Sequence, residues 1–99
     1  MANFALAGAA QADAPTKMYW TEQQASVIKR ANVAGTSIET LVTGASSASG
    51  LSLDGSKLYW TQTSGGLIKR ANLDGNSIET LVGGLTFPFG ILLEPSGKM

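Results

Sequence analysis

The chain of 99 residues contains neither cysteine nor histidine. Without cysteine there are no disulfides, and without either residue nearly every zinc, haem and iron–sulfur arrangement is excluded. The Ser–His and Cys–His machinery of many hydrolases is excluded for the same reason. We therefore expect no metal site and no cofactor, and the composition argues against an enzyme.

The chain also lacks an excess of either charge and lacks a long apolar run. Seven Lys and Arg residues balance seven Asp and Glu residues, so the formal net charge is zero. Nucleic-acid-binding proteins usually carry a basic surplus, so we expect no nucleic-acid partner. No apolar run approaches the about 20 residues of a membrane-spanning helix, and we expect no membrane insertion.

A chain this small needs support beyond its own core. A domain of this size buries roughly 60–65% of the surface of its unfolded chain. Small domains commonly rely on disulfides, metals or oligomerisation. With the first two excluded, oligomerisation remains as the source of stability, and the first expected partner is another copy of the chain.

The N-terminal region allows two interpretations. Residues 4–13 resemble the end of a bacterial signal peptide, and Ala10-Gln11-Ala12 fits a small-x-small cleavage site, but a basic segment is missing and the apolar stretch is short. The alternative is that residues 1–16 form an extension or a weak inner strand. The signal-like composition favours a secreted or extracellular location, which the rest of the sequence leaves undetermined.

The dominant feature is an internal repeat with a spacing of 40 residues. Residues 18–44 and 58–84 align without gaps, and 16 of these 27 positions are identical. The alignment then pairs residues 50–54 with residues 90–94. A fixed period of this length is typical of repeat architectures. It divides the chain into an N-terminal extension (1–16), a first repeat (17–56) and a second repeat (57–99).

Each copy contains four short runs with turn residues between them, which predicts four strands. Asp54-Gly55 and Asp74-Gly75 are typical of tight hairpin turns. The predicted strands are residues 17–21, 27–32, 37–42 and 51–54 in the first alignment, and 57–61, 67–72, 77–82 and 91–94 in the second. Both faces of the strands carry apolar residues, so each sheet must lie between two others, as in a β-propeller. The predicted fold class is all-β, with two propeller blades per chain.

The residues Tyr19-Trp20-Thr21 and Tyr59-Trp60-Thr61, each followed by Ile-Lys-Arg-Ala-Asn, resemble the YWTD repeat (class B) of low-density lipoprotein receptors. The resemblance covers about residues 17–99 and implies a six-bladed β-propeller. Two departures stand out. Glu22 and Gln62 occupy the position of the family's Asp, and the Cys-rich modules that accompany the receptor propellers are missing. Receptor ligands are therefore not transferred to this chain.

Two blades are one third of such a ring and would expose two apolar faces, so we expect a homotrimer with a threefold axis. Four-bladed dimers and eight-bladed tetramers are geometrically possible. The last predicted strand has no following partner within the repeat order, and we expect it to pair with residues 17–21 of the next copy. This oligomer latch consists of Gly90, Ile91, Leu92, Leu93 and Glu94. In the competing interpretation, residues 4–12 supply that strand.

Several side chains are candidates for binding, and each has a structural alternative. Trp20 and Trp60 could stack on a ligand or pack between blades. Arg30 and Arg70 could bind carboxylates or form ion pairs with Glu39 and Glu79. The residues expected to be structural or interblade are Tyr19, Trp20, Arg30, Tyr59, Trp60 and Arg70.

Phe87 and Phe89 replace Ser47 and Ser49 of the first copy, so the shared fold does not demand them. They lie on a predicted loop, and a ligand contact and simple packing are both open. The polar candidates beside them, which a carbohydrate site would need, are Gln23, Gln24, Gln62 and Ser64.

These observations favour a non-enzymatic binding or scaffold propeller assembled from two-blade subunits. A carbohydrate-binding, lectin-like propeller is the first alternative, since repeated weak sites gain strength through multivalency. A fragment or engineered two-blade unit, with self-assembly as its only activity, is the second. The expected partners are the chain itself and a glycan or protein ligand.

Overall fold

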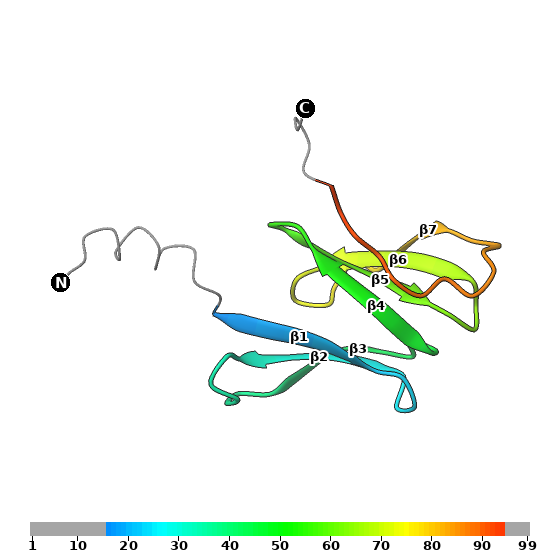
Figure 1. Cartoon of the computed structure of the whole chain (residues 1–99). Coiled ribbons are helices and arrows are strands. Elements are labelled where there is room, and N and C mark those ends of the chain that lie inside the picture. Colours follow the sequence, from blue (N-terminus) through cyan, green and yellow to red (C-terminus); the bar gives the residue numbers. More distant parts are fainter. Residues whose placement is uncertain (1–15, 95–99) are drawn as a thin grey trace.

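The computed structural model describes residues 16–94, which form seven β-strands and no helix (Figure 1). The predicted all-β class is confirmed. The strands are β1 (Lys17–Glu22), β2 (Val27–Asn32), β3 (Glu39–Thr43), β4 (Ala48–Leu53), β5 (Lys57–Gln62), β6 (Leu67–Asn72) and β7 (Glu79–Val82). The predictions made for residues 4–12 lie outside the described residues.

The strands form two antiparallel meanders. The first sheet has three strands in the order β1-β2-β3, and the second has four in the order β4-β5-β6-β7. The register repeats with the sequence, since Trp20 pairs with Lys29 in the first sheet and Trp60 pairs with Lys69 in the second. The second sheet is thus a complete four-stranded blade. Within residues 16–94, the first sheet is the same blade without the strand that would pair with β1.

Several strand boundaries differ from the prediction. β3 and β7 begin two residues later than expected, because Ser37 and Ser77 adopt positive φ values of 56° and 60° and belong to the preceding turns. β4 begins at Ala48, three residues before the predicted start, because Ala48 already pairs with Gln62 across the sheet. Turn geometry and cross-strand pairing, which propensity does not specify, set these boundaries.

The predicted strand at residues 91–94 is not formed within the single chain. The residues have no partner strand among those described, and Leu92 is 91% exposed. A strand needs a neighbour that takes up its backbone hydrogen bonds. The latch residues are therefore present as an unpaired segment that follows β7.

The core lies between the two sheets, and one face of the first sheet packs on one face of the second. It consists of Ile28, Val42, Ala45, Ala48, Leu58, Trp60 and Ala71. Trp60 is the largest fully buried side chain. Full burial of a large apolar side chain contributes about 1.5–3 kcal/mol, so the packing of blade on blade contributes substantially to the stability of the unit.

Candidate functional site

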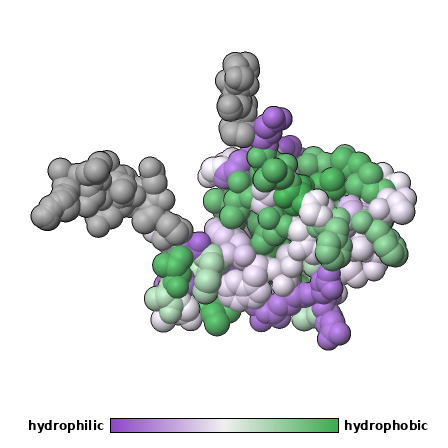
Figure 2. All heavy atoms as spheres, viewed as in Figure 1, coloured by the Kyte–Doolittle hydropathy of each residue, from purple (hydrophilic) through white to green (hydrophobic). Residues whose placement is uncertain are grey.

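Two sheet faces lie on the outside of the two-blade unit. The outer face of the first sheet carries Met18 and Trp20, and the outer face of the second carries Ile68 and Val82. Alternation along a strand puts these residues opposite the faces that form the core. Figure 2 shows apolar residues gathered over the second sheet and the segment that follows it.

Burial differs sharply between equivalent positions. Val42 is 3% exposed in the core, whereas its repeat partner Val82 is 41% exposed. In the opposite sense, Leu58 is fully buried while its partner Met18 is 42% exposed. The outer face of the second sheet therefore has the same repeat positions as the buried face of the first sheet. The outer face of the first sheet likewise has the same repeat positions as the buried face of the second.

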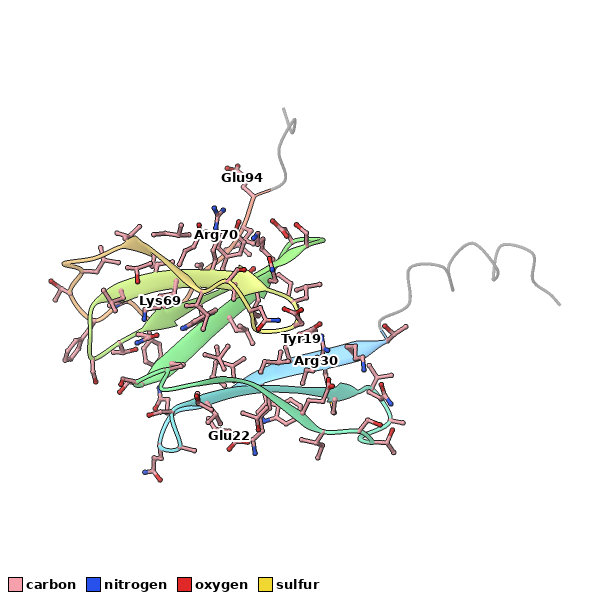
Figure 3. The ribbon with its side chains drawn as sticks, turned by 180° about the vertical axis from the view of Figure 1, so that it is seen from behind. Tyr19, Glu22, Arg30, Lys69, Arg70 and Glu94 are labelled. Atoms are coloured by element: carbon pink, nitrogen blue, oxygen red, sulfur yellow. The ribbon has the colours of Figure 1, made fainter. Side chains whose placement is uncertain are left out.

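The two arginines differ in the same way. Arg30 donates from Nε to Glu39 Oε1 at 2.6 Å and from Nη1 to the carbonyl of Leu73 in the second blade at 2.8 Å. Arg70 makes the same 2.6 Å ion pair with Glu79, but its Nη1 reaches only the Tyr59 hydroxyl at 3.5 Å. Figure 3 shows Arg30 between the sheets and Arg70 on the far side of the second sheet.

The segment after β7 lies on the second sheet as β4 lies on the first. Thr21 Oγ1 donates to the Ser49 carbonyl at 3.2 Å, and the equivalent Thr61 Oγ1 donates to the Phe89 carbonyl at 3.0 Å. Gly50 has no room for a Cβ, because the backbone of residues 89–91 passes directly against it. Residues 89–91 thus occupy the position at which the first strand of a further blade would begin.

The fourth position of each YWT motif accepts a hydrogen bond from the motif's own tryptophan. Trp20 Nε1 donates to Glu22 Oε2, and Trp60 Nε1 donates to Gln62 Oε1, both at 3.0 Å. The indole bond, followed by the nearby Lys29 ammonium, lowers the pKa of Glu22. A carboxylate and a carboxamide therefore accept the same structural bond in the two copies.

Gln62 is placed differently from the other polar ligand candidates. It ends β5 and does not lie in the loop, its side chain is 4% exposed, and it is engaged with Trp60. The other polar candidates are exposed: Gln23 donates to Ser49 Oγ at 2.7 Å, and Ser64 shares a 2.7 Å hydrogen bond with Ser47. The loop that carries Gln24 leaves it exposed as well.

The aromatic candidates differ in their surroundings. Trp60 belongs to the core and Trp20 is partly exposed on the outer face of the first sheet. Tyr19 and Tyr59 stand beside the arginines of their own blades. Phe87 and Phe89 are 73% and 64% exposed, so the fold does not use them for packing within one chain.

Hydrogen bonds shift the pKa of several surface carboxyl groups. The Arg30 guanidinium lowers the pKa of Glu39, and Arg70 does the same to Glu79. The same bonds raise the pKa of both arginines. The backbone N–H groups of Ser56 and Lys57 lower the pKa of Asp54 in its turn. These carboxylates stay ionised and are engaged in structural bonds.

Within residues 16–94 there is no cluster of metal-ligating side chains, and no helix that could cross a membrane. Sequence reasoning overlooked several contact groups: Thr21 and Thr61, the Ser49–Thr63 hydroxyl pair, and the carbonyl of Leu73. The threonines were detectable as identical repeat positions. The carbonyl was not, because any residue supplies one.

Comparison with known proteins gives a structural likeness without a sequence family. No protein-family model matches the chain, and no curated protein matches it. The structure is similar to a chain in the crystal structure of a nidogen/laminin complex, with a TM-score of 0.71 and 26% identity. The match covers 76% of this chain and 31% of that chain. The likeness supports a propeller-like arrangement of the two sheets, and the present chain spans about a third of the neighbour.

Proposed function

We propose that the chain is a non-enzymatic binding or scaffold propeller, in which three two-blade copies close one six-bladed ring. The observation that carries the proposal is the match between the outer faces and the buried faces. Because the residues of each outer face repeat those of a face in the core, the contact between the two blades of one chain can recur between copies. A head-to-tail contact that turns one third of a circle closes with three copies.

The repeat offset specifies the contacts at each junction between copies. Arg30 donates to the carbonyl of Leu73 within the chain. Shifting both partners by one repeat gives the equivalent contact at the junction between copies. There, Arg70 takes the place of Arg30, and Val33 of the next copy takes the place of Leu73, so Arg70 donates to the carbonyl of Val33. Val33 is 51% exposed in the single chain and is available for this contact.

The latch follows from the same offset. Leu51 pairs with Trp60, and Leu53 pairs with Leu58, inside the second sheet. The corresponding pairs between copies join Ile91 to Trp20 and Leu93 to Met18. The unpaired segment then supplies the strand that the first sheet lacks, and the backbone groups on the free edge of β1 gain partners.

A non-enzymatic role fits the chemistry of the carboxylates. Glu22, Glu39 and Glu79 are each engaged with a neighbouring side chain, and Asp54 accepts from its own turn. A glycoside hydrolase needs two carboxyl groups that are free to act on the substrate. The structural neighbour, described as a complex of nidogen with laminin, supports a protein-binding or scaffold role for a fold of this kind.

The mass in solution tests the ring. We expect light scattering after size exclusion to give about three times the chain mass of 10.2 kDa. A monomer at micromolar concentration would contradict the ring and favour a two-blade fragment of a longer propeller. A dimer or tetramer would keep head-to-tail closure but change the number of blades.

A further inference from the structure

The loops at one end of the blades carry no ionisable side chain, and the ionisable residue directly before them, Glu22 at the end of β1, is paired with Lys29. The loops after β1, β3, β5 and β7 meet at this end (Figure 1). They comprise residues 23–26, 44–47, 63–66 and 83–90, and none of these is Asp, Glu, Lys or Arg. The turns at the opposite end include Asp54 and Asp74, so the charge of the described chain is distributed unevenly between the two ends.

We propose that this neutral end binds an uncharged carbohydrate at each junction between two copies of the chain. The site combines Phe87 and Phe89 of one copy with Gln24 of the next. The inference rests on the ring proposed above, because neither copy holds the whole site.

The equivalent junction inside one chain is closed by hydroxyl groups. Gln23 donates to Ser49 Oγ, which shares a 2.7 Å hydrogen bond with Thr63 Oγ1. Ser47 and Ser64 form a second hydroxyl pair at 2.7 Å. Ser47 and Ser49 precede or begin β4, and Thr63 and Ser64 follow β5, so these groups satisfy one another at the β4–β5 edge of the second sheet, and Gln23 adds a bond from the first sheet. This junction therefore offers few free groups to a ligand.

The junction between copies cannot close in this way. Phe87 is the repeat equivalent of Ser47, and Gln24 is the repeat equivalent of Ser64. At the junction between copies, Phe87 therefore faces Gln24 of the next copy, in place of the Ser47–Ser64 pair inside the chain. A phenyl ring neither donates nor accepts a conventional hydrogen bond. The carboxamide of Gln24 is therefore left free beside two exposed aromatic rings.

The backbone gives a second reason to regard the phenylalanines as functional. Phe87 has a φ of 45°, close to the 53° of Ser47 at the same place in the first copy. A bulky side chain in this left-handed region is unfavourable, and serine meets the fold's requirement there. Phe87 therefore has an unfavourable backbone conformation for its side chain, and this side chain is exposed.

The chemistry of the site indicates the ligand class. Aromatic rings stack on the apolar C–H face of a sugar, while carboxamide and hydroxyl groups bond to its hydroxyls. Phosphates and acidic sugars would need Arg or Lys, which these loops lack. Three equivalent sites on one ring convert weak binding of single sugars into multivalent binding.

A glycan array probed with the full chain tests the inference, with the mass in solution measured in parallel. The array should contain neutral oligosaccharides together with sialylated and sulfated ones. We expect binding to neutral glycans only. The double variant F87S/F89S restores the residues of the first copy, and we expect it to stay trimeric and to lose at least about tenfold in binding, as for a lost ~1.4 kcal/mol.

Two single variants refine the test. Gln24→Ala should weaken binding about tenfold, as expected for a lost hydrogen bond to a ligand. Ser47→Ala, which alters only the junction inside the chain, should bind like the unmodified protein.

The outcomes separate the two proposals. A trimer that binds no neutral glycan, binds only acidic ones, or keeps its binding in F87S/F89S overturns the carbohydrate site and leaves the ring intact. Loss of the trimer in F87S/F89S would show that the rings pack between copies, which also overturns the site. A monomeric unmodified chain would overturn the ring, and the composite site with it.

Discussion

The two repeats have nearly the same sequence and different surroundings. In the first sheet, the face with Ile28 and Val42 is buried, while the face with Met18 is open; in the second sheet the burial is reversed. Since the register and the Arg–Glu ion pair are the same in both copies, they do not cause the difference. The neighbouring sheet causes it. Each open face therefore carries the residues that the other repeat buries.

The largest expected effect comes from removing the latch. Deleting residues 90–99 should convert the proposed trimer to a monomer, because the first blade then lacks the fourth strand that the proposal assigns to it. Size exclusion with light scattering measures the change. Deleting residues 1–12 is the matched control and should leave the trimer intact. The reverse result, with the trimer lost only in the N-terminal deletion, would assign the missing strand to residues 4–12.

The valine pair compares the buried and open faces directly. Under dilute conditions that favour the monomer, Val42→Ala should lower the free energy of unfolding by about 1–3 kcal/mol, because two buried methylene-sized groups are lost and a cavity remains. Val82→Ala should cost less than about 0.5 kcal/mol in the same urea titration. At concentrations that favour the trimer, the two variants should become equally destabilised. A persistent difference at all concentrations would contradict burial of Val82 between copies.

Substitution of the two arginines compares the same two repeats, and we expect a smaller effect than for the valines. Arg70→Ala should weaken trimer formation about tenfold, the loss expected for one charge-assisted hydrogen bond. Arg30→Ala should instead lower the stability of the single chain, because its bond to Leu73 lies inside the chain. Sedimentation equilibrium and urea unfolding separate the two quantities. Equal effects of both variants on assembly would contradict the proposed bond to Val33.

The smallest expected effect is on acid stability. Glu39 and Glu79 have pKa values below the ordinary 4.5 because of their arginine partners. A lowered folded-state pKa contributes stability above the unfolded-state pKa, and this contribution is lost as the pH falls through the folded value. The melting temperature should therefore fall below about pH 4.5, modestly because both pairs are exposed and screened. Glu79→Gln should flatten this fall, and a melting temperature that rises on acidification would contradict the assignment.

Much of the fold could be predicted from periodicity. β2 and β6 have the predicted bounds, since their apolar runs end at clear turn signals. The start of β4 and the starts of β3 and β7 were wrong, because cross-strand pairing and left-handed serines set them. For the candidate site, the exposed phenylalanines were detectable as departures from the repeat. The burial of Gln62 was not, because it depends on how the indole of Trp60 is oriented.

The sequence by itself determined the repeat unit, the strand pattern and the positions where the copies differ, because these depend on residue order and local turn chemistry. Only the tertiary structure decided which of two equivalent residues is buried between the sheets and which is exposed. Burial depends on what lies across the sheet, and one sheet can cover only one face of its neighbour. The same valine is therefore in the core at position 42 and on an open face at position 82.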